Sequence, residues 1–103
     1  MRIEISKSSV GAGWYYRTAA QRVSTSNLTG LVDALWQCMS HAPGSRWRIL
    51  LVPKLIPHVG ADYTVAVMNT IGDLADPPPV AEGLTPQQVY YQIQPYLNML
   101  ESQ

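Results

Sequence analysis

The chain has 103 residues, of which 47% are hydrophobic and 14% charged, and its formal net charge is zero. This length fits one domain with a hydrophobic core, and the composition excludes the highly charged, weakly hydrophobic class of disordered proteins. No apolar run approaches the ~20 residues of a membrane helix, and Glu4 lies where a secretory signal would have its apolar stretch. We therefore expect one folded domain, located in the cytoplasm, without membrane association.

Residues 1–42 are predicted to form two strands and a helix. "RIEIS" at 2–6 alternates polar and apolar residues, and "WYYRTAAQRV" at 14–23 is rich in β-formers, so the two segments predict a hairpin. In the segment that follows, apolar residues recur at helical spacing, Ser26 or Asn27 is placed to cap the first turn, and Pro43 and Gly44 end the helix. The predicted buried residues of this helix are Leu28, Leu31, Val32, Leu35 and Met39.

Residues 46–71 predict a second pair of strands. "RWRILLV" at 46–52 has Trp47, Ile49 and Leu51 on one face, and "YTVAVMNTI" at 63–71 supplies the other strand. Residues 72–84 contain three consecutive prolines and are predicted to be a connector, because proline fixes φ and lacks a backbone donor.

A last helix is predicted over residues 85–101. Thr85, Pro86 and Gln88 have the spacing of a capping box with proline in the first helical position. Pro95 lies inside this helix and predicts a bend near Gln94. The predicted buried stripe consists of Val89, Ile93, Leu97 and Leu100, whereas Tyr90, Tyr91, Tyr96 and Met99 lie off it and could form a dimer or partner surface.

The element order ββαββα predicts an α+β fold. Because each helix has a single apolar stripe to bury, the simplest arrangement is a four-stranded, mainly antiparallel sheet with both helices packed on one face. The opposite face of the sheet would then be exposed or covered by a partner.

That exposed face is the predicted contact surface. Alternation divides residues 14–23 into two sets, Trp14, Tyr16 and Arg22 on one side and Tyr15 and Arg17 on the other, and the sequence leaves open which set is buried. All seven basic residues lie in the first 54 positions, and this asymmetry is typical of chains with a polyanionic partner, although the two halves could also neutralise each other. The candidate partner-binding residues are Trp14, Tyr15, Tyr16, Arg17, Arg22, Arg46 and Arg48.

Two binding functions fit such a surface. The chain has six tyrosines, three tryptophans and no phenylalanine, and Tyr, Trp and Arg are the residues enriched at interface hot spots. We therefore expect a small non-catalytic module that docks on another protein or nucleoprotein, as an adaptor or inhibitor does, with edge pairing by "RIEIS" or a homodimer as further options. The alternative is a single-stranded nucleic-acid binder that stacks bases on the same face.

The sequence shows no catalytic, cofactor or metal signature. Cys38 and His41 are three residues apart on the first predicted helix, but a packed thiol beside a helix-terminal histidine explains this spacing better than a nucleophile with its base. His58 and Asp62 belong to a turn-rich segment, and no phosphate-cradling glycine loop occurs. We therefore expect no enzymatic activity, no cofactor and no metal ion.

Overall fold

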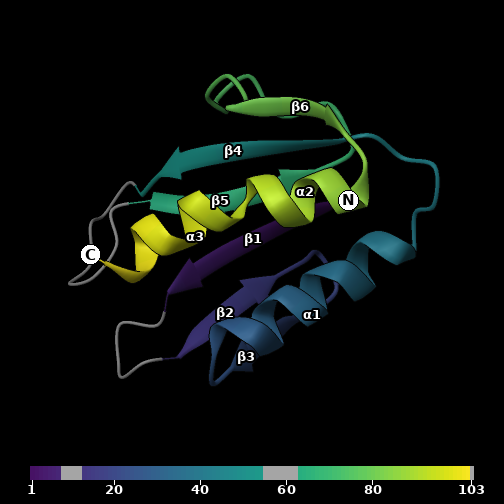
Figure 1. The fold of residues 1–103 in the computed structure, drawn as a ribbon. Helices are drawn as coiled ribbons and strands as arrows, with labels where there is room; N and C mark the ends of the chain where they lie inside the picture. The colour runs from purple at the N-terminus through teal and green to yellow at the C-terminus, as the bar shows by residue number, and fades with distance from the viewer. Residues whose placement is uncertain (8–12, 55–62, 103) are drawn as a thin grey trace.

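The computed structural model describes residues 1–7, 13–54 and 63–102 and has an α+β fold with an antiparallel sheet, as predicted (Figure 1). The strands are β1 (Arg2–Lys7), β2 (Trp14–Arg17), β3 (Arg22–Thr25), β4 (Trp47–Pro53), β5 (Tyr63–Met68) and β6 (Ala81–Leu84). The helices are α1 (Leu28–Ser40), α2 (Pro86–Gln92) and α3 (Gln94–Glu101).

The sheet has six strands in these ranges, so the prediction of four is wrong. Their order is β3-β2-β1-β5-β4-β6, and every neighbouring pair is antiparallel. Strand β1 lies inside the sheet, paired with both β2 and β5, so the expected edge pairing by "RIEIS" is also wrong. The edges are β3 and β6.

The segment 14–23 is two strands joined by a turn, not one continuous strand. The Thr18 hydroxyl oxygen accepts hydrogen bonds from the backbone N–H groups of Ala20 and Gln21, at 3.2 and 3.3 Å. The Thr18 N–H donates to the Gln21 carbonyl at 2.8 Å and closes the turn. Side chains of this kind can replace glycine or proline in forming a turn, because they hydrogen-bond their own backbone locally.

Strand β6 lies inside the predicted connector of residues 72–84. The Val80 N–H donates to the Ile49 carbonyl at 2.8 Å just after the prolines, and β6 then pairs with β4 across a bulge between Trp47 and Ile49. Gly83 has φ 69°, in the left-handed region that favours glycine. Only the first part of the segment is therefore a connector.

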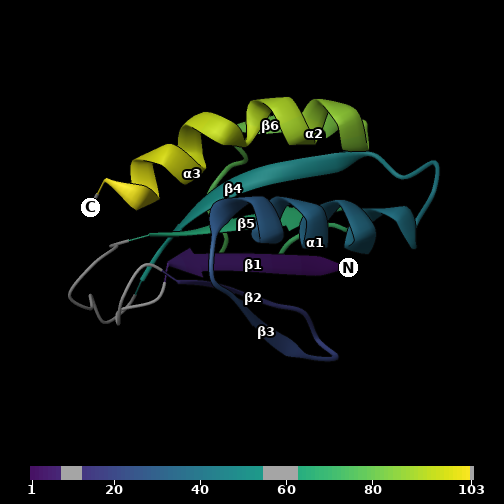
Figure 2. The same ribbon diagram turned by 60° about the horizontal axis from the view of Figure 1, so that its bottom comes forward.

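All three helices lie on one face of the sheet (Figure 2). Helix α1 contacts β2 and β3, α2 contacts β4 and β6, and α3 contacts β1 and β5. The main core lies between the two layers, and the predicted buried stripe of the C-terminal helical segment is confirmed, with all four residues fully buried. Its sheet side consists of Ile3, Ile5, Trp14, Tyr16, Trp47, Ile49, Val65, Val67 and Leu84.

The helix ends follow the predicted capping pattern. Asn27 caps α1, its side-chain oxygen accepting from the Gly30 N–H at 2.8 Å. Thr85 and Gln88 form the predicted capping box at the start of α2. The predicted bend is also confirmed, because α2 ends at Gln92 and α3 begins at Gln94, with Pro95 in its first turn.

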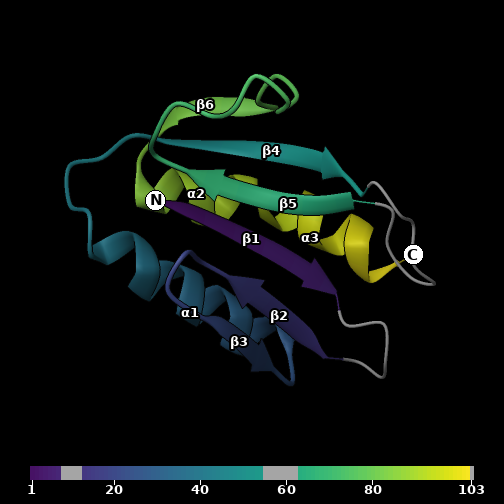
Figure 3. The same ribbon diagram turned by 180° about the vertical axis from the view of Figure 1, so that it is seen from behind.

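The sheet face without helices is seen in Figure 3. It has a small apolar cluster of its own, formed by Leu50, Ala66 and Met68. The segment after β5 turns back against this face, since a Cβ added to Gly72 would lie 3.4 Å from the Met68 sulfur. The Asp76 carboxylate accepts from both terminal nitrogens of Arg2, at 2.6 and 3.0 Å, and fixes this segment to β1.

Among the described residues, no helix has the length and apolar character needed to cross a membrane.

Candidate functional site

The seven predicted contact residues do not share one surface. Trp14 and Tyr16 are only 2% and 8% exposed and belong to the core on the helix side of β2. Burial raises the pKa of the Tyr16 hydroxyl above its ordinary value. Their placement on an exposed sheet face is therefore corrected: these two rings stabilise the fold and are covered by the chain's own side chains.

Tyr15, Arg17 and Arg22 do lie together, on the sheet face without helices, which we call the open sheet face. Arg22 pairs directly with Arg17 across the β2–β3 turn, which puts it on the face opposite to the one that a continuous strand would give. The Arg22 guanidinium carbon lies 4.2 Å from the centroid of the Tyr15 ring. Arg17 donates to the Glu4 carboxylate at 2.9 Å. Both guanidinium groups thus already have partners within the molecule.

The remaining two arginines are separated from this group. Arg48 lies on β4 and donates to the Thr70 carbonyl at 2.9 Å. Arg46 is exposed but precedes β4 and belongs to no strand. Of the acids in the second half of the chain, Asp76 pairs with a guanidinium, that of Arg2. An aromatic and cationic sheet face formed by all seven residues is therefore not present.

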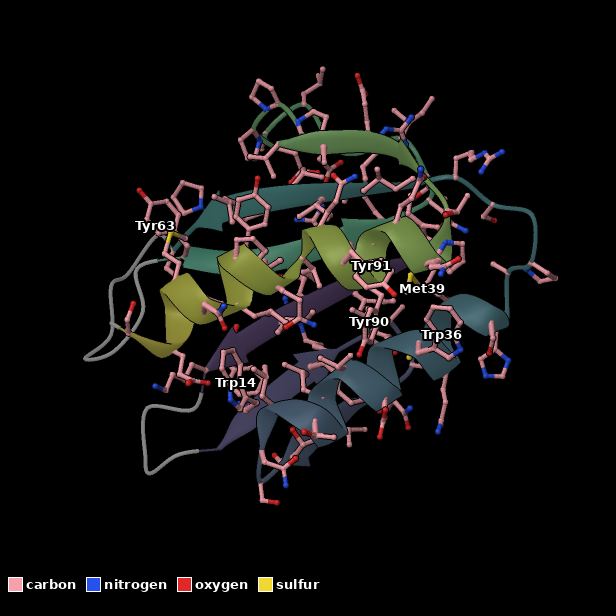
Figure 4. The ribbon with its side chains drawn as sticks, in the orientation of Figure 1. Trp14, Trp36, Met39, Tyr63, Tyr90 and Tyr91 are labelled. Atoms are coloured by element: carbon pink, nitrogen blue, oxygen red, sulfur yellow. The ribbon has the colours of Figure 1, made fainter. Side chains whose placement is uncertain are left out.

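A different aromatic surface is found on the helix side. Trp36 of α1 and Tyr90 of α2 have ring centroids 6.3 Å apart, and Tyr90 and Tyr91 have centroids 5.4 Å apart, both pairs with an interplanar angle of 89°. Their side chains are 45%, 39% and 65% exposed, respectively. Figure 4 shows the three residues gathered where α1 and α2 meet. We call Trp36, Tyr90 and Tyr91 the aromatic cluster.

The aromatic cluster lines one end of a groove between α1 and α2. A cavity of about 340 Å³ is bounded by the cluster together with Asp33 and Gln87. A second cavity of about 200 Å³ continues toward the start of α1 and shares Asp33 and Tyr90 with the first. Asp33 is the one charged residue among those that line the two cavities. Among the described residues, no Lys, Arg or His side chain lies within 4.0 Å of the Asp33 carboxylate.

Comparison with known protein families, curated proteins and solved structures found no match. The geometry of this chain is therefore the basis of its proposed function.

The geometry of Cys38 favours a packed thiol. Cys38 is half-buried against the main core, and burial raises the pKa of its thiol, which reduces the nucleophilic thiolate fraction at neutral pH. His41 caps α1 through its backbone N–H, which donates to the Cys38 carbonyl at 3.3 Å. His58 and Asp62 lie outside the described residues. Within the described ranges, no three His, Cys, Asp or Glu residues are grouped so that they could hold a metal ion.

Part of the aromatic cluster has a signal in the sequence. Tyr90 and Tyr91 lie off the apolar stripe of their helix, and both are exposed as that pattern predicts. Tyr96, which was grouped with them, packs partly against the core. The contribution of Trp36 depends on how α1 and α2 pack, and helical periodicity alone contains no information on that.

Proposed function

We propose that the protein is a non-catalytic binding module that docks on another protein through the aromatic cluster and the groove beside it. The observation that supports this is the set of three exposed aromatic rings on the helix layer, in which Tyr90 packs against both Trp36 and Tyr91. Large aromatic side chains left open to water are unfavourable for an isolated domain, and Trp and Tyr are the residues most enriched at interface hot spots.

The geometry of the cluster favours binding for a second reason. Each edge-to-face contact between rings contributes about 0.5 to 1.5 kcal/mol beyond burial, so the rings hold one another in place before any partner arrives. Side chains that are already ordered lose little conformational entropy on binding. Their hydroxyl and indole N–H groups can also find polar partners at the rim of an interface.

The open sheet face fits a docking role less well. Its arginines have internal partners in Glu4, Tyr15 and the Thr70 carbonyl, so a partner would have to displace these contacts. The nucleic-acid alternative relied on the same face, yet Trp14 and Tyr16 are buried and one face of Tyr15 is occupied by Arg22. These contacts of the described residues do not favour base stacking on that face, so we do not propose that function.

The proposal is tested by comparing the proteins captured from the native cell by wild type and by Trp36→Ala. A protein that is lost with the variant is identified by mass spectrometry, and its affinity is measured with purified components by calorimetry. Removal of a hot-spot tryptophan is expected to cost at least about 2 kcal/mol, or about 30-fold in Kd. Trp36→Ala also removes the edge-to-face contact with Tyr90, which lowers the melting temperature, so affinities are compared at a temperature at which circular dichroism shows both proteins to be folded.

Two exposed residues away from the cluster provide matched controls. Tyr63 of β5 is an exposed aromatic residue at the other end of the molecule (Figure 4), and Leu74 is a fully exposed aliphatic residue after β5. Tyr63→Ala and Leu74→Ala should leave capture and affinity unchanged. Capture that survives Trp36→Ala, or that depends equally on Tyr63 or Leu74, would contradict the proposal.

A further inference from the structure

We propose that the groove beside the aromatic cluster takes an arginine side chain of the partner protein, with its guanidinium between the Asp33 carboxylate and the exposed rings. This inference rests on the proposed function and specifies the chemistry that the groove recognises. It depends on three features of the described residues: the acid in the groove wall, the orientation of the rings, and the absence of a cation among the lining residues.

Charge determines the class of group that the groove can hold. Asp33 is shared by both cavities and therefore lies near the middle of the groove. The other lining side chains are neutral: Leu28, Thr29, Val32, Trp36, Gln87, Tyr90, Tyr91 and Gln94. An anion would meet the carboxylate without any compensating donor of opposite charge. A cation would gain from the carboxylate and also from the negative faces of the aromatic rings.

The ring geometry provides a flat surface as well as an edge. Because Trp36 and Tyr90 meet at 89°, as do Tyr90 and Tyr91, the ring faces point in different directions around the groove. A planar cation can stack on one face while its N–H groups reach toward the acid. A guanidinium stacked on an aromatic ring already occurs on the other side of this chain, where the Arg22 guanidinium carbon lies 4.2 Å from the Tyr15 ring centroid.

Arginine fits this site better than lysine. Its guanidinium is planar, stacks on aromatic faces and offers a fork of donors that matches a carboxylate. It is also less strongly hydrated than an ammonium group, which matters in a groove whose walls are largely open to water. Arginine is itself enriched among interface hot spots, next to Trp and Tyr.

The inference is tested with a short peptide and the full protein labelled with ¹⁵N. The probe is acetyl-Ala-Arg-Ala-amide, and its controls are the same peptide with citrulline, the neutral isostere of arginine, and with lysine. The chain has three tryptophans, so the indole N–H region of the spectrum has three signals, of which Trp14 and Trp47 are buried. The signal lost in Trp36→Phe assigns the third, and the buried two are internal references.

The arginine peptide is expected to shift the Trp36 signal in a saturable way at millimolar concentrations, with the lysine peptide weaker and the citrulline peptide without effect. Asp33→Asn should weaken arginine binding about two- to fivefold, the range for an exposed ion pair or cation–π contact. The matched control is Glu82→Gln, an exposed acid on β6 at the sheet edge away from α1, and it should bind like wild type.

Equal shifts with arginine and citrulline, or unchanged binding by Asp33→Asn, would overturn the inference. A Trp36 shift that grows with protein concentration without peptide, and disappears in Asp33→Asn, would replace the foreign partner with a second copy of the chain. If capture requires Trp36 but the arginine peptide does not bind, this inference fails and the proposed function stands. If capture does not require Trp36, the proposed function fails, whatever the peptide does.

Discussion

Replacement of Asp76 by asparagine should destabilise the fold more than any other single loss of charge in the segment after β5. Asp76 accepts two hydrogen bonds from Arg2 and a third, at 3.0 Å, from the Asp73 N–H. The two contacts with Arg2 link this segment to β1, whereas the third lies within the segment. Asparagine keeps the shape of the side chain but removes the charge that strengthens the contacts with Arg2.

The magnitude follows from the exposure of the pair. A hydrogen bond to a charged group contributes about 1.5 to 3 kcal/mol when well shielded. The Arg2 side chain is 30% exposed and keeps Glu4 as a second partner at 3.4 Å, so the contribution lies near or below the lower end of that range. We expect a loss of about 1 to 2 kcal/mol, which for a domain of this length lowers the melting temperature by about 4 to 16 °C.

The effect should depend on pH in one direction. The hydrogen bond from Arg2 lowers the pKa of the Asp76 carboxyl from its ordinary value of 3.8. The folded protein therefore holds this group ionised where the unfolded chain protonates it. The contribution is fully present above about pH 4 and is lost as the pH falls through the lowered pKa. The difference in stability between wild type and Asp76→Asn should shrink in that acidic range.

Thermal unfolding followed by circular dichroism measures both effects. Asp73→Asn is the matched control, because it removes the same charge from the same segment and its side chain is exposed. Gly72→Ala gives an independent perturbation, since its added Cβ would lie 2.5 Å from an Asp76 carboxylate oxygen and should displace it. The reasoning is refuted if Asp76→Asn melts no lower than Asp73→Asn at neutral pH.

Three further outcomes are expected from contacts described above. Thr85→Ala removes the cap of α2 and should cost about 1 kcal/mol in chemical denaturation, whereas Thr85→Ser should restore most of it. Cys38 should react with iodoacetamide more slowly than a free thiol at pH 8, because burial raises its pKa, and equal rates would show that the thiol is open. Labelled single-stranded DNA or RNA should show no binding at low salt, and affinity that falls steeply with salt would restore the nucleic-acid alternative.

The elements with strong periodicity were predictable from the sequence. The C-terminal helical segment buries all four predicted residues, and α1 and β4 bury most of theirs, with Leu28 and Leu51 only partly buried against the core. The two missed strands have weak local signals. The turn before β3 is formed by the Thr18 hydroxyl without glycine or proline, and β6 has four residues that are held by pairing with β4.

Of these two strands, β3 is the one that carries a predicted contact residue, Arg22. The turn at Thr18 reverses the face of Arg22, so strand alternation predicted the wrong neighbours for this side chain. The burial of Trp14 and Tyr16 follows from the position of α1 over β2, which is a tertiary contact. The aromatic cluster likewise joins residues 54 positions apart, and only helix packing brings Trp36 to Tyr90.

The interior position of β1 affects the order in which the sheet can be completed. Its second neighbour, β5, comes much later in the chain, and the Ser6–Thr64 hydrogen bond between them spans 58 positions. During synthesis the β1-β2-β3-α1 unit emerges first, with one side of β1 unpaired until β5 leaves the ribosome. Long-range pairing of this kind slows folding and leaves an unpaired strand edge exposed, which is prone to aggregation. A chain stopped before residue 63 should therefore aggregate, although it contains α1 and four of the strands in the described ranges.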